Sequence, residues 1–301
     1  MGFGEKMFKK NTMIYTGKDV NLDVALLADL HANKNTDYTW LYKNATFLRD
    51  GYPDFIAVLG DMLDDGLDYE SAKRVSDILD KYREIAPVVM INGNHDLITK
   101  KDGKWKVIST DEELKVGEQI SNLYRSIPNV SYLLNDSVSF SIKNVNFYGA
   151  NPNIHYYDDE YSPYDTLEDS VIKQFDSKVD NDNFNIFLTH SPKSFMDNTF
   201  IRGYSLFDNM DLFLSGHMHN GLVPIYFEKF VPSHYGLVGF SRKKKILFPE
   251  LAKGTVNISE TAKGVIANPY CTISNGKGKV SSLNSLFPPV SQTVKVRKRI
   301  K

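Results

Sequence analysis

The sequence has little cysteine, no long apolar run and almost no excess of charge, and each shortage excludes a class of protein. The single cysteine, Cys271, excludes an internal disulfide and a cluster of thiolate metal ligands. No apolar stretch reaches the roughly 18 to 20 residues that a membrane helix needs, and the opening MGFGEKMFKKN lacks the apolar middle of a signal peptide. We therefore expect a soluble, cytoplasmic chain, whereas an anchor upstream in the natural protein would make it membrane-associated.

The charges are nearly balanced. With 36 basic and 37 acidic residues the formal net charge is -1, so no broad electrostatic attraction draws the chain to nucleic acid. Hydrophobic residues at 42% and aromatic residues at 12% are ordinary for a soluble globular enzyme. Because α/β chains of this length often share one large core, we expect a single domain over 1–301.

Strand-like and helix-like segments alternate along most of the chain. Five short apolar runs each end in a polar cluster, as in strands covered on both faces; they lie at 20–31, 53–61, 86–96, 183–192 and 210–219. Segments with helical spacing stand between the strands, at 36–49, 68–83, 111–126 and 165–179. This alternation predicts an α/β fold.

Two further regions depart from this alternation. The runs VSYLL and SFSIKNVNFYG, within 130–149, alternate between apolar and polar residues and predict an antiparallel hairpin. Short β-like runs separated by Gly, Pro and Ser fill 221–290 and predict strands of a second, mixed sheet. The basic tail, 291–301, is expected to fray.

The polar clusters that follow the five apolar runs contain most of the histidines. Ligands collect beyond the carboxyl ends of strands in open α/β sheets, so these side chains predict one shared site. Without cysteine, a metal there needs nitrogen and oxygen ligands. The cluster residues are Asp29, His31, Asp61, Asn94, His95, Asp96, His190, His217 and His219, and they include five of the seven histidines.

In the order DLH, GDMLDD, GNHD, THSP and GHMH, the clusters resemble the five signature motifs of the calcineurin-like metallophosphoesterases. The resemblance covers 24–220. It implies a four-layer α/β/β/α sandwich with two mixed sheets and a dinuclear metal site at the carboxyl ends of the strands. It also implies hydrolysis of phosphomonoesters or phosphodiesters through a bridging hydroxide. The continuation after GHMH resembles a bacterial phosphohydrolase and phosphodiesterase branch, although Asn220, Gly221 and Leu222 replace its Gly-Gly-Gln.

By similarity to the family, seven residues are metal ligands for two divalent ions. Asp61 bridges, because a carboxylate can offer one oxygen to each of two ions. Manganese, iron or zinc suits imidazole and carboxylate ligands without sulfur. The first ion takes Asp29, His31 and His219, and the second takes Asn94, His190 and His217. Gly216 is expected to give the backbone room to turn before the last two histidines.

His95 is the candidate general acid. In the family the matching histidine contacts the phosphate and protonates the leaving oxygen, with the following Asp96 as its orienting partner. The alternative role for His95 is to steady Asn94. Asp64, in GDMLDD, is expected to orient a ligand rather than to bind metal.

The sequence indicates the substrate and the partners less clearly than the metal ligands. The tyrosine-rich loop 151–164 is either a lid over the substrate or an ordinary loop packed on its own domain. The stretch 222–249, with the basic run RKKK, predicts either a solvated hairpin or a phospholipid or membrane-surface contact. A small phosphorylated substrate is the leading expectation. A nuclease of the same fold and a catalytically silent scaffold are the alternatives, but a nuclease needs a positive groove and a scaffold should have lost ligands.

Overall fold

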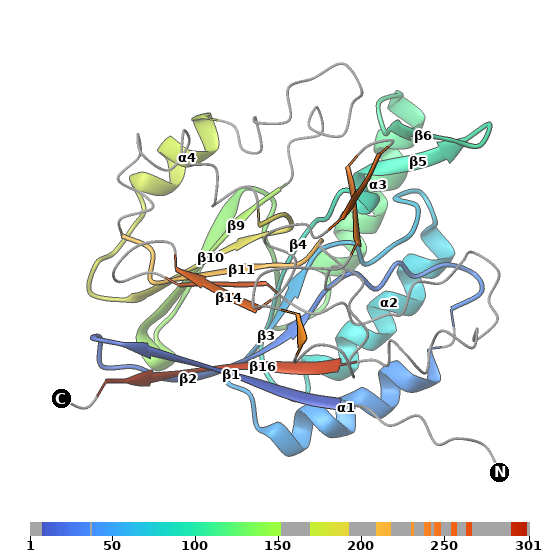
Figure 1. Cartoon of the computed structure of the whole chain (residues 1–301). Helices are drawn as coiled ribbons and strands as arrows, with labels where there is room; N and C mark the ends of the chain where they lie inside the picture. Colours follow the sequence, from blue (N-terminus) through green and yellow to red (C-terminus); the bar gives the residue numbers. More distant parts are fainter. Residues whose placement is uncertain are drawn as a thin grey trace, which may run out of the picture.

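A computed structural model shows a mixed α/β fold with two six-stranded sheets and two short hairpins (Figure 1). The residues that the structure describes are 8–36, 38–151, 169–192, 209–217, 230–231, 238–241, 244–247, 254–257, 263–266 and 290–299. None of the described helices is both long enough and apolar enough to cross a membrane.

All neighbouring strands of the first sheet pair in parallel except one pair, which includes the last strand of the chain. Its order is β1 (Phe8–Thr16), β16 (Val290–Lys298), β2 (Asn21–Leu27), β3 (Phe55–Leu59), β4 (Val88–Ile91) and β7 (Val130–Tyr132). Strand β16 runs parallel to β1 and antiparallel to β2, while β2, β3, β4 and β7 are parallel to one another.

The second sheet has four parallel strands flanked by an antiparallel strand at each edge. Its order is β14 (Gly254–Asn257), β15 (Lys263–Ile266), β11 (Leu212–Ser215), β10 (Phe184–Thr189), β9 (Val145–Ala150) and β8 (Asp136–Phe140). The mixed second sheet expected from 221–290 therefore exists, and β14 and β15 are the strands that this region contributes.

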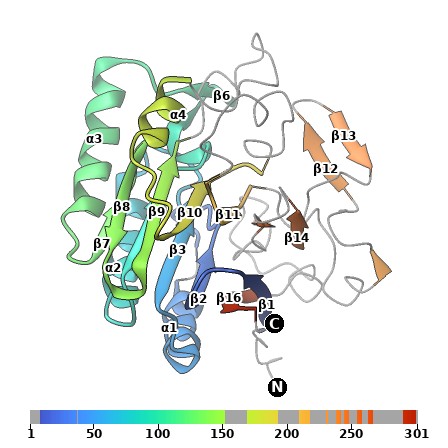
Figure 2. The same ribbon diagram turned by 90° about the vertical axis from the view of Figure 1, so that its left-hand side faces the viewer.

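Two hairpins stand outside the large sheets. They are β5 (Ile98–Lys101) with β6 (Lys104–Val107), and β12 (Val238–Ser241) with β13 (Lys244–Leu247). Figure 2 shows the second of these apart from both six-stranded sheets. The described residues of 222–249 thus include one antiparallel pair of strands.

Alternation of side chains along the strands divides the core into two. In β3, Phe55, Ala57 and Leu59 face the second sheet and pack with its residues, and the Phe55 ring lies 5.1 Å from that of Phe147 in β9. Ile56 and Val58 face the opposite way, into a separate cluster. Because successive side chains of a strand point to opposite faces, every central strand must be apolar throughout.

Helices α1 (Thr39–Gly51), α2 (Tyr69–Tyr82) and α3 (Asp111–Arg125) contribute the other half of this second cluster. Helix α4 (Asp169–Asp176) lies elsewhere, at the upper left of Figure 1. The buried Phe175 of α4 has its ring centroid 5.8 Å from that of Tyr148 in β9 and 6.0 Å from that of Phe187 in β10. Helix α4 therefore packs on the face of the second sheet that points away from the first.

Helices α2 and α3 each begin directly after a polar capping residue. Asp68 caps α2 by accepting a hydrogen bond from the Ser71 backbone nitrogen at 3.0 Å. Thr110 and Glu113 form a capping box at the start of α3. The helices expected at 68–83 and 111–126 are confirmed to within one residue at each end.

The hairpin expected between the two runs of 130–149 is wrong. The first run becomes β7, which pairs in parallel with β4, and the second run contains the end of β8, a turn and most of β9, which pairs antiparallel with β8. The chain reverses at Lys143 and Asn144, whose φ angles are 69° and 51°. Alternation predicts a strand but carries no information on its partner or direction, so the turn inside the second run was missed.

The expectation of a frayed tail over 291–301 is also wrong for 291–298, which follow Val290 in one strand. These residues form β16 between β1 and β2, where Val294 and Val296 are fully buried. Lys295 and Arg297 point to the other face, and both form ion pairs with Asp23. Burial alone would raise the pKa of Asp23, but these two cations outweigh it and lower the pKa. Alternating valine and basic residues thus make a sheet strand, not a solvated tail.

The buried face of β16 provides a test of this strand assignment. Val294→Thr places a hydroxyl in the apolar core between the two sheets and should lower the free energy of unfolding by about 1 to 3 kcal/mol. In the control Lys298→Gln, the altered side chain is 54% exposed, and the change should stay within about 0.5 kcal/mol. Denaturant unfolding measures both, and equal midpoints for the two variants would contradict the placement of β16.

Candidate metal centre

Strand ends from both sheets meet at the predicted site. Asp29 and His31 follow β2, Asp61 follows β3, and Asn94 follows β4, all in the first sheet. From the second sheet, His190 follows β10 and His217 follows β11. His219 lies outside the described residues.

The backbone at the site adopts left-handed conformations that L-residues rarely take. The φ angles of Asp29, His31, Asp61 and His217 are 55°, 47°, 52° and 68°. Hydrogen bonds between the loops hold this geometry: Asp29 N donates to Gly60 O at 3.1 Å, and His31 N donates to Asp61 O at 2.9 Å. Such backbone strain clusters where a protein must aim particular side chains at one point.

Glycines allow the loops to approach closely. A Cβ on Gly93 would collide with the backbone nitrogen and the carboxylate of Asp61. A Cβ on Gly216 would lie 2.8 Å from the Cβ of Ala28. Gly216 therefore serves close packing of the second sheet's strand end on the first sheet, and it is His217, not the glycine, that takes the left-handed turn.

Asp61 is common to two groups of potential ligands. One group is Asp29, His31 and Asp61, and the other is Asp61, His190 and His217; within each group the ligand atoms lie within 4.8 Å of one another. The Asp61 Oδ2 atom is 3.5 Å from His31 Nε2 and 3.2 Å from His190 Nε2. Asp61 Oδ1 instead accepts a hydrogen bond from His95 N at 2.7 Å. A single oxygen thus faces both groups, which differs from the expected arrangement of one oxygen for each.

Hydrogen bonds orient the two histidines from the second sheet. His190 Nδ1 lies 2.7 Å from the carbonyl oxygen of Leu59, and donating there leaves Nε2 facing Asp61. His217 N donates to Asp29 Oδ1 at 3.0 Å, and His217 Nδ1 is 3.1 Å from His190 Nε2. The imidazoles of both residues therefore turn toward the carboxylates of the first sheet.

The buried carboxylates require positive charge. Asp29 and Asp61 are 0% and 1% exposed. Burial by itself would raise the pKa of Asp61, but His190, His95 and His31 hold it well below its usual range. Burial would likewise lower the pKa of His190, but the charge of Asp61 outweighs it and raises the pKa to about 9. The pocket thus stabilises cations beside its two carboxylates.

Asn94 adds an unused acceptor. The residue is 7% exposed, and its Oδ1 atom is buried and accepts no hydrogen bond from the part of the chain that the structure describes. A buried, unpaired carbonyl oxygen costs about 1 to 3 kcal/mol. Coordination of a cation would satisfy this oxygen, so the donor set of carboxylate, imidazole and amide atoms fits a metal site.

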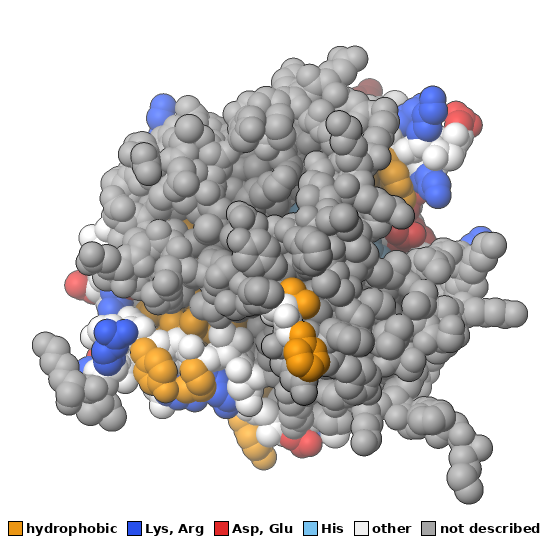
Figure 3. Space-filling view, viewed as in Figure 1, with side chains coloured by type: hydrophobic (Ala, Val, Ile, Leu, Met, Phe, Trp, Pro, Cys, Tyr) orange, Lys and Arg blue, Asp and Glu red, His pale blue; other side chains and the backbone are white. Residues whose placement is uncertain are grey.

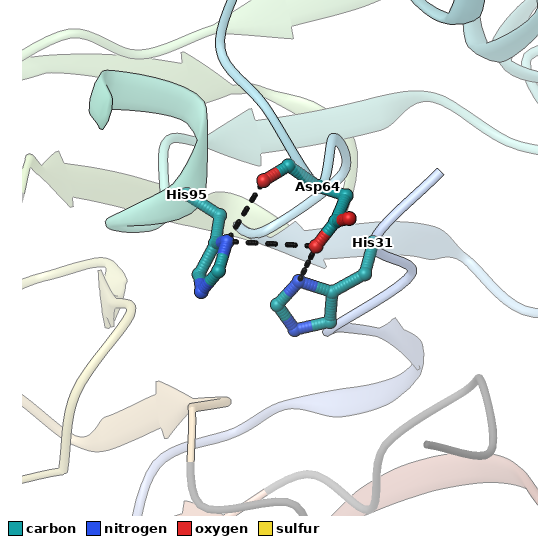
Figure 4. Close-up of side chains that lie close together, drawn as sticks. All are labelled: His31, Asp64 and His95. Carbon is teal, nitrogen blue, oxygen red and sulfur yellow. Dashed lines mark hydrogen bonds and ion pairs between the residues drawn. The ribbon is translucent and has the colours of Figure 1, made fainter. Parts of the chain in front are cut away.

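His95 is oriented by Asp64 (Figure 4). Its Nδ1 lies 2.9 Å from the backbone carbonyl oxygen of Asp64 and 3.8 Å from the Oδ1 of the same residue. Asp64 Oδ1 also lies 3.9 Å from His31 Nδ1, which agrees with an orienting role for Asp64. Because Nδ1 can donate to the carbonyl oxygen, Nε2 of His95 is left for other partners.

The contacts of Asp96 differ from those expected of a residue that orients His95. Its carboxylate accepts hydrogen bonds from Leu63 N at 3.0 Å and from Gly93 N at 2.8 Å. Burial, together with the nearby charge of Asp61, raises the pKa of Asp96 to about 6. Asp96 thus ties the loops after β3 and β4 together, and through them it fixes the backbone of Asp61.

One feature at the site was not anticipated from the sequence. Trp105, in β6, has its ring centroid 4.9 Å from that of His95. The signal was available, because the segment ITKKDGKWKV, which begins one residue after GNHD, contains the dipeptide DG between two short runs, a hairpin pattern. Sequence pattern could predict this hairpin but not its position against His95.

Comparison with known protein families identifies the family of the chain. The family described as calcineurin-like phosphoesterase matches residues 22–221, more than half of the chain. The protein belongs to this family and is a phosphoric ester hydrolase. The predicted family membership and enzyme class are therefore confirmed. No curated protein matches the sequence.

Several solved structures are similar to the chain at low identity. A dimetal phosphatase from Danio rerio is 12% identical with a TM-score of 0.47, and the match covers 83% of this chain and 88% of that one. A protein from Thermus thermophilus is 13% identical with a TM-score of 0.42, covering 78% and 92%. A purple acid phosphatase from yellow lupin seeds is 16% identical with a TM-score of 0.42, covering 68% and 39%.

The close approach at Gly93 can be tested by adding one methyl group. Gly93→Ala pushes against Asp61 and should lower the free energy of unfolding by about 1 to 3 kcal/mol. The control Gly117→Ala, in α3, adds a Cβ with nothing within 4 Å and should raise stability by about 0.5 to 1 kcal/mol. Thermal and denaturant unfolding measure both variants. If the two alanines have the same effect, the packing of the loops after β3 and β4 is not as described.

Proposed function

We propose that the protein hydrolyses phosphomonoester or phosphodiester bonds with the help of two divalent transition-metal ions, which are manganese, iron or zinc. The observation that carries this proposal is Asp61, whose Oδ2 faces two separate groups of ligands. The proposal includes the four-layer α/β/β/α sandwich of the family. Packing of α1, α2 and α3 on one sheet and of α4 on the other supports that arrangement.

Two sets of residues would hold the ions. The first ion would be held by Asp29, His31 and Asp61, with His219 as a further predicted ligand; the second would be held by Asp61, Asn94, His190 and His217. When bound, the ions supply neutralisation of the phosphate oxygens and an activated water nucleophile. The two divalent ions would bring four positive charges, and the carboxylates of Asp29 and Asp61 would neutralise two of them. The remaining positive charge would attract an anionic substrate.

The protein's own residues would hold His95 in position and transfer its proton. With Nδ1 held by the Asp64 carbonyl oxygen, the protonated form of His95 carries its second proton on Nε2. That proton can pass to the departing oxygen of the substrate. His31 and Trp105 flank the His95 ring, at 4.6 and 4.9 Å between centroids, and restrict its rotation. Asp96 supports the reaction indirectly, by bracing the backbone of the two loops.

The alternatives are less well supported. A silent scaffold should have lost ligands, whereas five of the seven predicted ligands lie together in these two groups, and Asn94 follows the neighbouring strand β4 with a buried acceptor. A nuclease needs a positive groove, and the net charge of -1 does not favour one. The cytoplasmic location and the phospholipid or membrane-surface contact through 222–249 stay predictions. So does the lid at 151–164, all of which except Asn151 lies outside the described residues.

Replacing Asp61 tests the shared ligand. The purified protein should bind two transition-metal ions per chain and lose activity with a chelator. Asp61→Asn should weaken both metal sites by at least about tenfold, because its Oδ2 faces both groups. His31→Ala and His190→Ala are the matched controls, and each should weaken chiefly one site. Metal titration followed by elemental analysis measures these affinities.

Two results would contradict this assignment. One is saturation of the unaltered protein at no more than one ion per chain. The other is an Asp61→Asn protein with two unchanged affinities, since a bridging carboxylate cannot be replaced without loss at both ions.

The role of His95 can be separated from metal binding by the choice of leaving group. His95→Ala should keep both ions and should lower kcat by roughly 10²- to 10⁴-fold for alkyl phosphate esters. An activated aryl leaving group scarcely needs a proton, so the loss on aryl esters should be much smaller. Steady-state kinetics on paired alkyl and aryl substrates, with metal analysis, make the comparison.

The other outcomes assign His95 a different role. Equal losses on both substrates, with the ions retained, would mean that His95 stabilises charge on the phosphoryl oxygens. Loss of the ions themselves would mean that it steadies Asn94, the alternative that follows from its position next to that ligand.

A further inference from the structure

Tyrosine side chains in this protein have two kinds of surroundings. Tyr15, in β1, is 53% exposed, and Figure 3 shows hydrophobic side chains at the surface at the lower left, where Figure 1 places the end of β1. Tyr132, the last residue of β7, instead packs against α3, and its hydroxyl group donates a hydrogen bond to Asn92 Oδ1. Asn92 directly follows β4 and is only 6% exposed. The pair therefore lies two residues from the candidate ligand Asn94.

The register of β4 and β7 explains this contact. Tyr132 is opposite Met90 in the parallel pair, and Leu133 N donates to Met90 O at 2.8 Å. Because side chains alternate along a strand, Met90 and Tyr132 point to the same face of the first sheet, which is the face that the helices cover. Asn92, two residues after Met90, returns to that face. The long phenol side chain thus reaches diagonally from β7 to the end of β4.

The surroundings of Tyr132 keep its hydroxyl group protonated. Burial raises the pKa of Tyr132 above its usual value, and the nearby charge of Asp96 raises it further. A neutral phenol donates a hydrogen bond, and Asn92 Oδ1, which carries no hydrogen, accepts it. Helix α3 holds the ring, whose centre lies 5.7 Å from that of Tyr124 and 6.0 Å from Arg125 Cζ. The donor is therefore fixed in both protonation and position.

Asn92 lies where the loops after β3 and β4 touch. A Cβ on Gly60 would lie 2.6 Å from the carbonyl carbon of Asn92, so the two loops are packed backbone to backbone. Three residues further on, His95 N donates to Asp61 Oδ1 at 2.7 Å. Between these two contacts lies Asn94, whose buried Oδ1 is a candidate ligand atom. A displacement of Asn92 would therefore move this amide oxygen relative to Asp61.

Tyr124 provides a comparison within the same cluster of side chains. It is 2% exposed, and its ring packs edge to face on that of Tyr132. Its hydroxyl oxygen is also buried, but it has no hydrogen-bond partner in the part of the chain that the structure describes. The two tyrosines thus share their apolar surroundings, and they differ in the hydrogen bond that links Tyr132 to Asn92.

We propose that Tyr132 is a positioning residue for the second metal ion: its hydrogen bond to Asn92 holds the loop after β4 so that Asn94 Oδ1 faces that ion. The inference rests on the proposed function, because it takes Asn94 to be a ligand of the second ion. Tyr132 touches neither ion nor substrate and acts through Asn92. Strand β7, which carries none of the seven predicted ligands, would in this way contribute to metal affinity.

Tyr132→Phe tests this role, because it removes the hydroxyl group and keeps the ring. In manganese titrations of the full chain, the affinity that His190→Ala weakens should fall by about 10- to 100-fold, and the affinity that His31→Ala weakens should change by less than about twofold. Tyr124→Phe is the matched control: it also removes one buried phenol oxygen, and both metal affinities should stay unchanged. Circular dichroism before each titration checks that the variants are folded.

A double-mutant cycle tests the path through Asn92. Asn92→Ala removes the acceptor and should weaken the second ion by a similar factor. Tyr132→Phe should then add less than about twofold in the Asn92→Ala background, since both changes remove the same interaction. A tyrosine that only stabilised the fold would give additive effects.

Four results would overturn the positioning role. They are an unchanged second-ion affinity in Tyr132→Phe, an equal loss at both ions, an equal loss in Tyr124→Phe, and additive effects of Tyr132→Phe and Asn92→Ala. Failure of the proposed function has a different signature: the effect of Tyr132→Phe on metal affinity would persist, but the metal-loaded unaltered protein would hydrolyse neither p-nitrophenyl phosphate nor bis(p-nitrophenyl) phosphate.

Discussion

The buried carboxylate of Asp61 is the constraint on which the rest of the site depends. A carboxylate that is 1% exposed must be compensated by cations and hydrogen bonds, because leaving it unpaired in the core is strongly unfavourable. The His95 backbone nitrogen binds one oxygen, and the imidazoles of His31 and His190 face the other. Close packing of Gly93 against Asp61 then leaves the carboxylate no alternative position.

Both sheets supply residues to this site. Carboxylates and the amide come from loops of the first sheet, and two imidazoles come from loops of the second. Their relative placement is set by the apolar core between the sheets, to which β3, β9 and β10 all contribute. Strand β16 lies between β1 and β2 in the first sheet, so even this strand from the end of the chain supports β2, which leads to Asp29.

The candidate metal ligands and the hairpin β5–β6 occupy different parts of the site. The candidate metal ligands lie at strand ends and in short loops that follow them. The hairpin β5–β6 follows one of those loops, and its Trp105 ring lies 4.9 Å from the ring of His95.

The sequence by itself determined which residue types stand at the strand ends, the order of the motifs and most helix and strand positions. These features follow from local periodicity, capping residues and turn residues, all of which are read within a few positions of the chain. Only the tertiary structure decided that β16 joins the first sheet, that β7 pairs with β4, and that Asp64 rather than Asp96 orients His95. It also decided that one oxygen of Asp61 faces both groups and that Trp105 meets His95. Each depends on contacts between distant segments, and local patterns do not encode strand partners, strand direction or the aim of a side chain.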